Sequence, residues 1–157
     1  MRLSLLLLPV LLAAQPAFAA VDLIRVDKSE RKLWLLDGAT VVREYDIHLG
    51  ANPEGPKERE GDGRTPEGRY LISGKNPNSR FTLSLRVSYP GADDRAAAAK
   101  SGVNPGGDIM VHGQPNAVPD AFVIPTDWTL GCIAVSNTAI REIYDLVDIG
   151  TPIEILP

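Results

Sequence analysis

The chain has 157 residues, of which 44% are hydrophobic and 23% are charged, with 16 basic and 20 acidic side chains. This composition predicts a single globular domain and excludes a disordered or fibrous protein. The formal net charge of −4 provides no basic surface for a phosphate backbone, so nucleic-acid binding is not expected. Fourteen glycines and thirteen prolines favour short elements joined by turns over a helical bundle.

The first nineteen residues have the pattern of a secretory signal peptide. Met1 and Arg2 begin the segment with a positive charge, residues 3–14 are apolar, and 17–19 read Ala-Phe-Ala, a small-residue cleavage pattern. The apolar run is shorter than the roughly 20 residues that cross a bilayer, which argues against a membrane anchor. No cysteine lies near the cleavage point, so a lipid-modified N-terminus is not expected. We therefore expect residues 20–157 to form one exported domain, periplasmic or secreted, with no transmembrane segment.

Hydrophobic periodicity in this domain predicts a mainly β fold with a little α. Alternating or β-branched apolar runs bounded by turn residues predict strands over 21–27, 32–36, 40–49, 69–74, 83–89, 108–112 and 152–156. One clear helix is expected over 138–147, capped by Ser136 or Asn137, and a shorter helix is indicated over 93–100. Residues 50–68 are polar and aperiodic, and a loop this long in a compact domain is typically functional or disordered.

A lone thiol in an exported protein needs an explanation. Cys132 is the single cysteine of the chain, and oxidising compartments normally pair cysteines or lack them. A small buried hydrophobic residue is the ordinary alternative to a functional thiol.

His112 ends an expected strand and Cys132 precedes the expected helix, so an imidazole would accept the thiol proton across one crevice. Gly131 allows a tight turn whose N–H groups would bind an oxyanion. Spacing alone does not distinguish this pair from a chance Cys…His combination.

Three separated motifs strengthen the catalytic interpretation. They occupy 61–70, which contains Thr-Pro-Glu-Gly, 109–113, which reads Ile-Met-Val-His-Gly, and 127–137, which contains Asp-Trp-Thr-Leu-Gly-Cys-Ile-Ala; Tyr89-Pro90 and 104–108 also fit. In this order they resemble the L,D-transpeptidase catalytic domain (YkuD type), particularly its YafK-like branch. The resemblance covers nearly all of residues 20–157. It implies a mixed β-sandwich with one clear helix after the catalytic cysteine, and a chemistry that requires no metal or cofactor.

The resemblance also implies roles for individual residues. Cys132 matches the nucleophile, His112 matches the general base and acid, and the backbone carbonyl of Gly113 is expected to orient the imidazole. Thr129 and Gly131 match positions beside the oxyanion pocket. Two neighbouring positions depart from the wording of many members: Leu130 precedes Gly131, and Ala134 stands where those members have an arginine. That departure leaves donor recognition without its expected arginine contact.

The implied reaction is acyl transfer on peptidoglycan stem peptides. Cys132 would attack the amide between a diamino acid and D-alanine, and an amine on a neighbouring stem or a lipoprotein lysine would take the acyl group from the thioester. Water as acceptor would make the chain a hydrolase that releases wall-attached lipoprotein, and the YafK-like resemblance leans toward that outcome. A non-catalytic wall-binding module and an exported cysteine peptidase of another fold remain alternatives.

Several other residues have both a functional and an ordinary interpretation. Arg64 and Lys57, in the polar loop, are candidates for binding stem-peptide carboxylates, although solvated loop charges are more common. Trp128 is a candidate for stacking on substrate, with packing against the core favoured. Asp127 is expected either to orient the loop before Cys132 or to act as a cap or turn residue. His48 is expected to be an ordinary strand residue.

Overall fold

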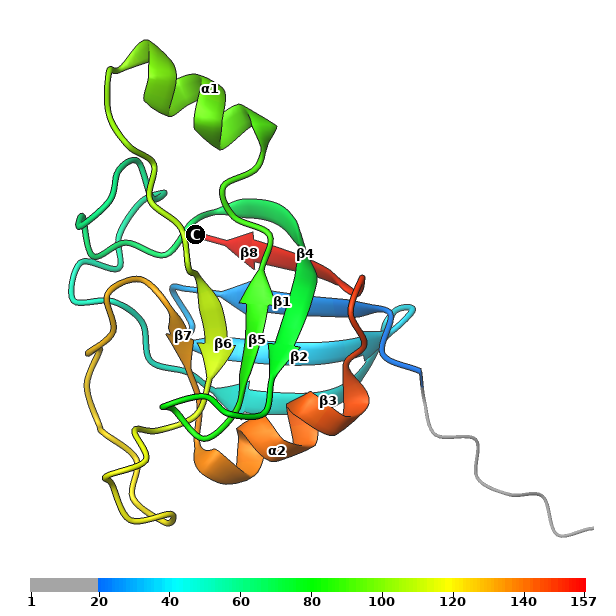
Figure 1. Cartoon of the computed structure of the whole chain (residues 1–157). Helices are drawn as coiled ribbons and strands as arrows, with labels where there is room; N and C mark the ends of the chain where they lie inside the picture. The colour runs from blue at the N-terminus through cyan, green and yellow to red at the C-terminus, as the bar shows by residue number, and fades with distance from the viewer. Residues whose placement is uncertain (1–19) are drawn as a thin grey trace, which may run out of the picture.

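The computed structural model describes residues 20–157, and the predicted signal peptide, 1–19, lies outside this range (Figure 1). The described chain contains β1 (Leu23–Asp27), β2 (Lys32–Asp37), β3 (Thr40–Asp46), β4 (Gly68–Asn76), β5 (Ser84–Val87), α1 (Ala92–Lys100), β6 (Met110–His112), β7 (Ile133–Ala134), α2 (Asn137–Leu146) and β8 (Pro152–Leu156). None of the helices in this range is both long and apolar enough to cross a membrane.

The strands form one mixed sheet in the order β3-β2-β1-β8-β4-β5-β6-β7. Most neighbours are antiparallel, whereas β1 pairs with β8 and β6 pairs with β7 in parallel. In Figure 1 the half formed by β4 to β7 runs across the half formed by β1, β2, β3 and β8, with α2 below both. The sheet therefore curls so that its two halves face each other, which confirms the predicted mainly β, sandwich-like fold.

The hydrophobic core fills the space enclosed by the curled sheet. In β1 and β2 alternate side chains are buried, as Ile24 and Leu35 illustrate, because successive residues of a strand point to opposite faces. The second half contributes Leu85 and Val111, and α2 contributes Ile143 from its apolar face. The alternation in the sequence therefore identified the residues that hold the two halves together.

The expected strand over 40–49 is wrong at its C-terminal end, because β3 stops at Asp46. The next residues leave β2 and pair with a different strand. The His48 N–H donates to the Ala134 carbonyl at 2.8 Å, and the Ala134 N–H donates back to His48 at 2.8 Å. The partner strand, β7, is only two residues long and was not predicted, since two residues carry no periodicity. The change of partner brings the start of the polar loop beside the segment that contains Cys132.

The polar loop between β3 and β4 is held by buried charges. Lys28, 2% exposed, donates to the carbonyls of Gly55 and Thr65 at 2.7 and 3.2 Å and to the Glu67 carboxylate at 2.7 Å. A buried ammonium is tolerated when its donors are matched in this way. The loop, which lacks helix and strand as predicted, is thereby fixed against the end of β1.

Candidate active site

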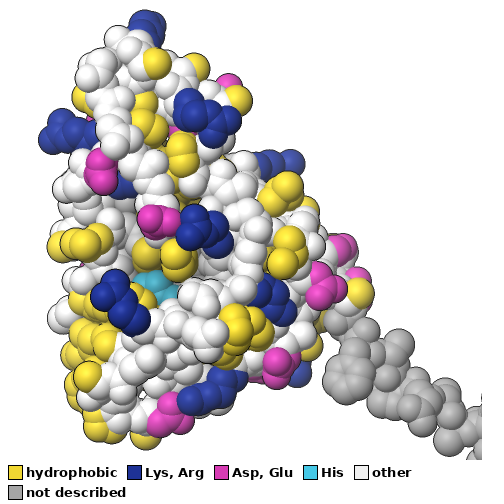
Figure 2. Space-filling view, viewed as in Figure 1, with side chains coloured by type: hydrophobic (Ala, Val, Ile, Leu, Met, Phe, Trp, Pro, Cys, Tyr) yellow, Lys and Arg dark blue, Asp and Glu magenta, His cyan; other side chains and the backbone are white. Residues whose placement is uncertain are grey.

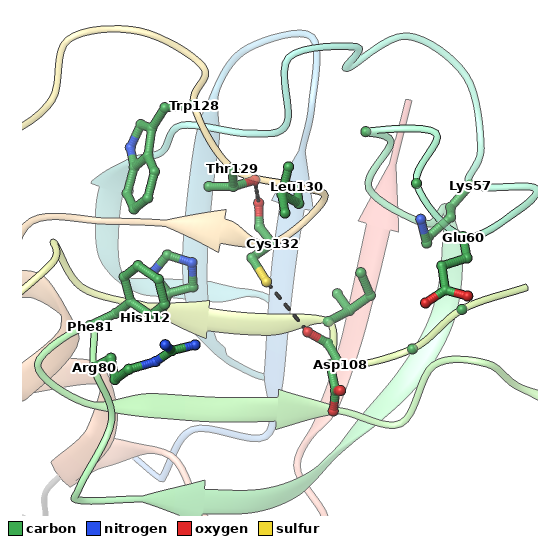
Figure 3. Close-up of a pocket in the computed structure, with 15 residues that line it drawn as sticks. Lys57, Glu60, Arg80, Phe81, Asp108, His112, Trp128, Thr129, Leu130 and Cys132 are labelled. Atoms are coloured by element: carbon green, nitrogen blue, oxygen red, sulfur yellow. Dashed lines mark hydrogen bonds between the residues drawn. The ribbon is translucent and has the colours of Figure 1, made fainter.

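A cavity of about 590 Å³ opens at the edge of the sheet formed by β6 and β7 (Figure 3). Figure 2 shows a histidine in a hollow of the surface, flanked by hydrophobic and charged side chains. Its wall is formed by the polar loop, the segment before β5, β6 with the segment before it, and the segment before β7. The lining residues are Lys57, Glu60, Gly61, Gly63, Arg80, Phe81, Gly106, Gly107, Asp108, Ile109, His112, Trp128, Thr129, Leu130 and Cys132.

The pairing of β6 with β7 brings His112 and Cys132 together. The parallel register aligns Val111 with Ile133 and His112 with Ala134. Val111 and Ile133 are fully buried in the core, so the residues that alternate with them lie on the opposite face, where His112 lines the cavity. Cys132 lies two residues before Ala134 and therefore on the same face as His112, one diagonal step away. Both predicted reactive residues line the same cavity.

The His112 ring is held in one orientation and one tautomer. Its Nδ1 lies 2.7 Å from the Gly113 carbonyl oxygen. A carbonyl only accepts hydrogen bonds, so Nδ1 carries the proton and Nε2 presents a lone pair. Burial lowers the pKa of His112, and the bond to Gly113 opposes this only in part. The ring also packs against Phe81, with centroids 4.5 Å apart, and Trp128, at 5.6 Å. The imidazole is thus neutral near pH 7 and ready to accept a proton.

The Cys132 thiol is protonated in the resting site. Burial raises its pKa, the backbone N–H of Met110 and the charge of Lys57 act in the opposite direction, and the Asp108 carboxylate raises it further. The thiol donates a hydrogen bond to the Asp108 carbonyl oxygen, which lies 3.5 Å from the sulfur (Figure 3). A raised thiol pKa beside a lowered imidazole pKa favours the neutral pair over an ion pair. The thiolate therefore has to form as the sulfur attacks.

The turn before Cys132 is fixed by hydroxyl groups. The Thr129 hydroxyl donates to the Cys132 carbonyl at 2.8 Å and accepts from the Gly131 N–H at 3.1 Å, and the Thr65 hydroxyl donates to the Gly131 carbonyl at 2.9 Å. Gly131 has a φ of +122°, and a Cβ there would lie 2.5 Å from the Arg64 carbonyl oxygen, so only glycine fits. The Gly131 N–H is occupied, whereas the Cys132 N–H makes no hydrogen bond within residues 20–157. Of these two N–H groups, that of Cys132 therefore has the unused donor that an oxyanion site requires.

The structure gives the two cationic loop candidates partners within the protein. The Lys57 ammonium lies at the cavity, but it contacts the Asp62 carboxylate at 2.7 Å and the Arg59 carbonyl at 3.0 Å, with its side chain 3% exposed. Burial raises the pKa of Asp62, but hydrogen bonds from Lys57 and three backbone N–H groups together lower it to about 2. Arg64 lines a neighbouring hollow and donates to the Pro56 carbonyl at 3.3 Å. The charges of both residues are used to hold the loop.

Asp127 and Trp128 hold the segment that leads to Cys132. One Asp127 carboxylate oxygen accepts from the Leu49 N–H at 2.7 Å, and the other pairs with Arg31 at 2.8 Å. Asp127 therefore orients the loop, one of its two predicted roles. Trp128 lines the cavity and also packs on the His112 ring, so the same side chain packs within the protein and forms part of the cavity wall.

Ser136, rather than Asn137, is the N-cap of α2, since its hydroxyl accepts from the Ala139 N–H at 3.1 Å. Asn137 is 3% exposed and its side-chain carbonyl accepts from the Gln114 N–H and the Thr82 hydroxyl, both at 2.8 Å. It therefore ties the residues that follow His112 to the segment before β5. His48 lies away from the cavity and contributes only the backbone pairing described above.

The sequence did not reveal Glu60, Arg80, Phe81 or Asp108 as parts of the site. All four line the cavity. Glu60, Arg80 and Phe81 lie in segments without periodicity, and Asp108 begins an expected strand but was given no role at the site. Such residues carry no signal of position until the folded chain places their segments around the thiol. Phe81, which packs on the His112 ring, is the clearest omission.

A thiol and an oriented imidazole on one edge of a curled β-sheet are the residue types that cysteine-dependent acyl transfer requires. Residues 22–155 match the family model described as the L,D-transpeptidase catalytic domain, YkuD, and the chain belongs to this family. The relative named "Putative L,D-transpeptidase YafK" from Escherichia coli K12 is 29% identical over 130 residues, which are 79% of this chain and 46% of that protein.

Two solved structures show the same architecture at a similar level of identity. The helical cell shape determining protein Pgp2 from Campylobacter jejuni is 26% identical with a TM-score of 0.68, and the match covers 86% of this chain and 47% of Pgp2. Bd1075 from Bdellovibrio bacteriovorus is 27% identical with a TM-score of 0.61, covering 87% and 48%. The chain thus spans about half the length of these relatives.

Proposed function

We propose that this chain is an exported cysteine acyltransferase that acts on peptidoglycan stem peptides through a thioester on Cys132. The observation that carries the proposal is the neutral His112 imidazole, fixed by the Gly113 carbonyl and presented on the same strand face as the thiol in an open cavity. Membership of the L,D-transpeptidase family and the description of Pgp2 as a cell shape determining protein support the cell wall as substrate.

The first step forms the thioester. The Cys132 sulfur attacks the carbonyl carbon of the amide between the diamino acid and D-alanine, while His112 Nε2 takes the thiol proton. The carbonyl oxygen becomes an oxyanion that accepts from the Cys132 N–H. Collapse of this intermediate breaks the C–N bond, and the imidazolium gives its proton to the departing amine of D-alanine. Because the Nδ1 proton stays hydrogen-bonded to the Gly113 carbonyl oxygen, the ring needs no reorientation between the two proton transfers.

The second step returns the enzyme to its resting form. Neutral His112 takes a proton from the acceptor, whose nitrogen or oxygen attacks the thioester carbon, and the Cys132 sulfur leaves and recovers the proton. An amine on a neighbouring stem gives a cross-link, a lipoprotein lysine gives an attached lipoprotein, and water gives hydrolysis. A site open to solvent admits all three acceptors, so product analysis has to separate them.

Incubation of the exported chain with wall fragments, with and without bound lipoprotein, tests the proposal by mass spectrometry. We expect release of D-alanine, an acyl adduct on Cys132, and new cross-linked or hydrolysed stems. Release of lipoprotein would identify the hydrolytic alternative. Unchanged fragments together with failure of a carbapenem to acylate Cys132 would contradict catalysis and favour a wall-binding module.

A further inference from the structure

Arg80 is a cation of the cavity whose charge the protein does not use. Of the two basic side chains that line the cavity, Lys57 is paired with Asp62, as described above. The exposed Arg80 guanidinium makes no hydrogen bond or ion pair within residues 20–157. In Figure 3 the side chain lies beside Phe81 and His112, at the end of the cavity opposite Lys57 and Glu60, with Cys132 between them.

The backbone that carries Arg80 is firmly held beside the reactive pair. The Arg80 carbonyl accepts from the Asn116 N–H at 3.0 Å, and the neighbouring Phe81 carbonyl accepts from the Gly113 N–H at 3.0 Å. The Phe81 ring packs on the His112 ring. The Arg80 backbone is therefore tied to Gly113, whose carbonyl orients the imidazole, so the fold fixes the point beside the cavity from which the Arg80 side chain extends.

The geometry points to Arg80 as the residue that binds the terminal carboxylate of the leaving D-alanine. This inference rests on the proposed function. The leaving amine takes its proton from His112, so the D-alanine residue has to lie next to the imidazole. Its carboxylate is one residue beyond the broken bond, within about 4 Å of the amine. On the His112 side of the cavity the free positive charge within residues 20–157 is that of Arg80, whose planar fork matches a carboxylate.

Two consequences for specificity follow. The site should prefer stems that end at D-alanine over stems in which that carboxyl is amidated or extended. The opposite end of the cavity, where Glu60 lies, offers no free cation for the same group, because Lys57 is neutralised there. A terminal carboxylate therefore also sets the direction in which the stem lies across Cys132.

The test compares a stem tetrapeptide ending in D-alanine with the same peptide ending in D-alanine amide, in wild-type protein and in Arg80→Gln. A charge-assisted hydrogen bond predicts that wild type prefers the acid by about 10- to 100-fold in kcat/KM. Arg80→Gln should lose that preference by slowing the acid alone, and Arg80→Lys should restore part of it as a point charge. Arg95→Gln, which removes another exposed arginine on α1 outside the cavity, is the matched control.

Alkylation of Cys132 by neutral iodoacetamide should be unchanged in Arg80→Gln, which separates substrate binding from thiol activation. Equal slowing of acid and amide, or no preference in wild type, would overturn the inference. If wild type converts neither peptide, the proposed function fails, and binding of both peptides to Cys132→Ala protein decides the inference alone. Equal dissociation constants would then overturn it, whereas a preference for the acid that Arg80→Gln abolishes would support it.

Discussion

The two ends of the sheet are stabilised in different ways. At one end β1, β2 and β3 have 5, 6 and 7 residues and are joined by backbone ladders with one register shift, at Leu35/Leu36, and alternate side chains of β1 and β2 are fully buried in the apolar core. At the other end β5, β6 and β7 have 4, 3 and 2 residues, and single side chains complete the structure. Thr65 and Thr129 bond the backbone of the turn before β7, and Asn137 bonds the backbone that follows β6.

We call β1, β2 and β3 the framework, and β5, β6 and β7 with the loops around the cavity the reactive edge. Long ladders and apolar packing make the first end stable but chemically inert. The second end exposes a thiol and an imidazole, and its short strands leave room for a cavity between loops. Substitutions at the first end should therefore change the free energy of unfolding, whereas substitutions at the second should change turnover, and the following variants examine that separation.

Replacement of Cys132 by alanine should have the largest effect. The nucleophile is lost, and we expect no detectable release of D-alanine from stem peptides, because no other described residue in the cavity is a cysteine or serine. The sulfur is half-buried and makes one weak hydrogen bond, so the thermal unfolding midpoint should change little. Substantial turnover by Cys132→Ala would contradict the mechanism.

His112 should control the pH dependence of activity. Because the pKa of His112 lies below its ordinary value of about 6.5, the imidazole stays neutral until the pH falls below that value. We therefore expect kcat/KM to fall with acidification only below about pH 6.5, by about tenfold per pH unit. His112→Ala should lose nearly all activity and this acidic limb together. Alkylation of Cys132 by iodoacetamide, which requires thiolate, should rise only at alkaline pH because burial raises the thiol pKa. A plateau of rapid alkylation at neutral pH would instead indicate a thiolate–imidazolium pair.

The contrast between the long strands and the short ones also explains which parts of the fold and of the site could be predicted from the sequence. Strands β1, β2 and β8 were predicted to within two residues, because half-buried strands with a buried alternate face carry a period of two. The amphipathic helix α2 was placed to within one residue for the corresponding reason. Cys132 and His112 were singled out by residue type and by the resemblance of their motifs. The register of β6 and β7 then places both on one face of the sheet.

The parts that the sequence did not reveal lack such a pattern. β7 is too short to show a period, and its pairing with His48 depends on where the chain leaves β2. Arg80 and Phe81 belong to an aperiodic segment that is held at the cavity by the distant Asn116, whose side chain bonds the backbone of Ser79 and Thr82 and whose backbone N–H donates to Arg80. The engagement of Lys57 by Asp62 is likewise a contact between residues whose charges looked equally available in the sequence.

Leu35→Ala should damage the framework without changing the chemistry. Leu35 is fully buried between β1 and β3, and removal of its side chain should lower the free energy of unfolding by about 3 kcal/mol. Denaturant unfolding measures this loss, and kcat/KM per folded molecule should match that of wild type. Exposed Leu71 provides a control, because Leu71→Ala removes the same atoms from a half-solvated position and should cost far less. A large fall in activity of folded Leu35→Ala protein would show that the core of the first end reaches the site.

Two neighbours at the start of α2 give the sharpest comparison, because one caps a helix and the other supports the site. Ser136→Ala removes the N-cap and should lower the free energy of unfolding by about 1 kcal/mol with unchanged kcat/KM. Asn137→Ala leaves the buried Gln114 N–H without its acceptor, at a cost of about 2 kcal/mol, and leaves the Thr82 hydroxyl only the Gln114 carbonyl at 3.2 Å. Gln114 follows Gly113, whose carbonyl orients His112, so this variant should also lose activity at temperatures where it is fully folded. Asn137→Asp keeps the acceptor oxygen, but it places a second carboxylate where the Asn137 amide now donates to Asp120 at 3.1 Å, so it should recover only part of that activity. If Ser136→Ala and Asn137→Ala instead lowered stability and activity in the same proportion, the reactive edge would depend on the helix as a whole rather than on this one amide.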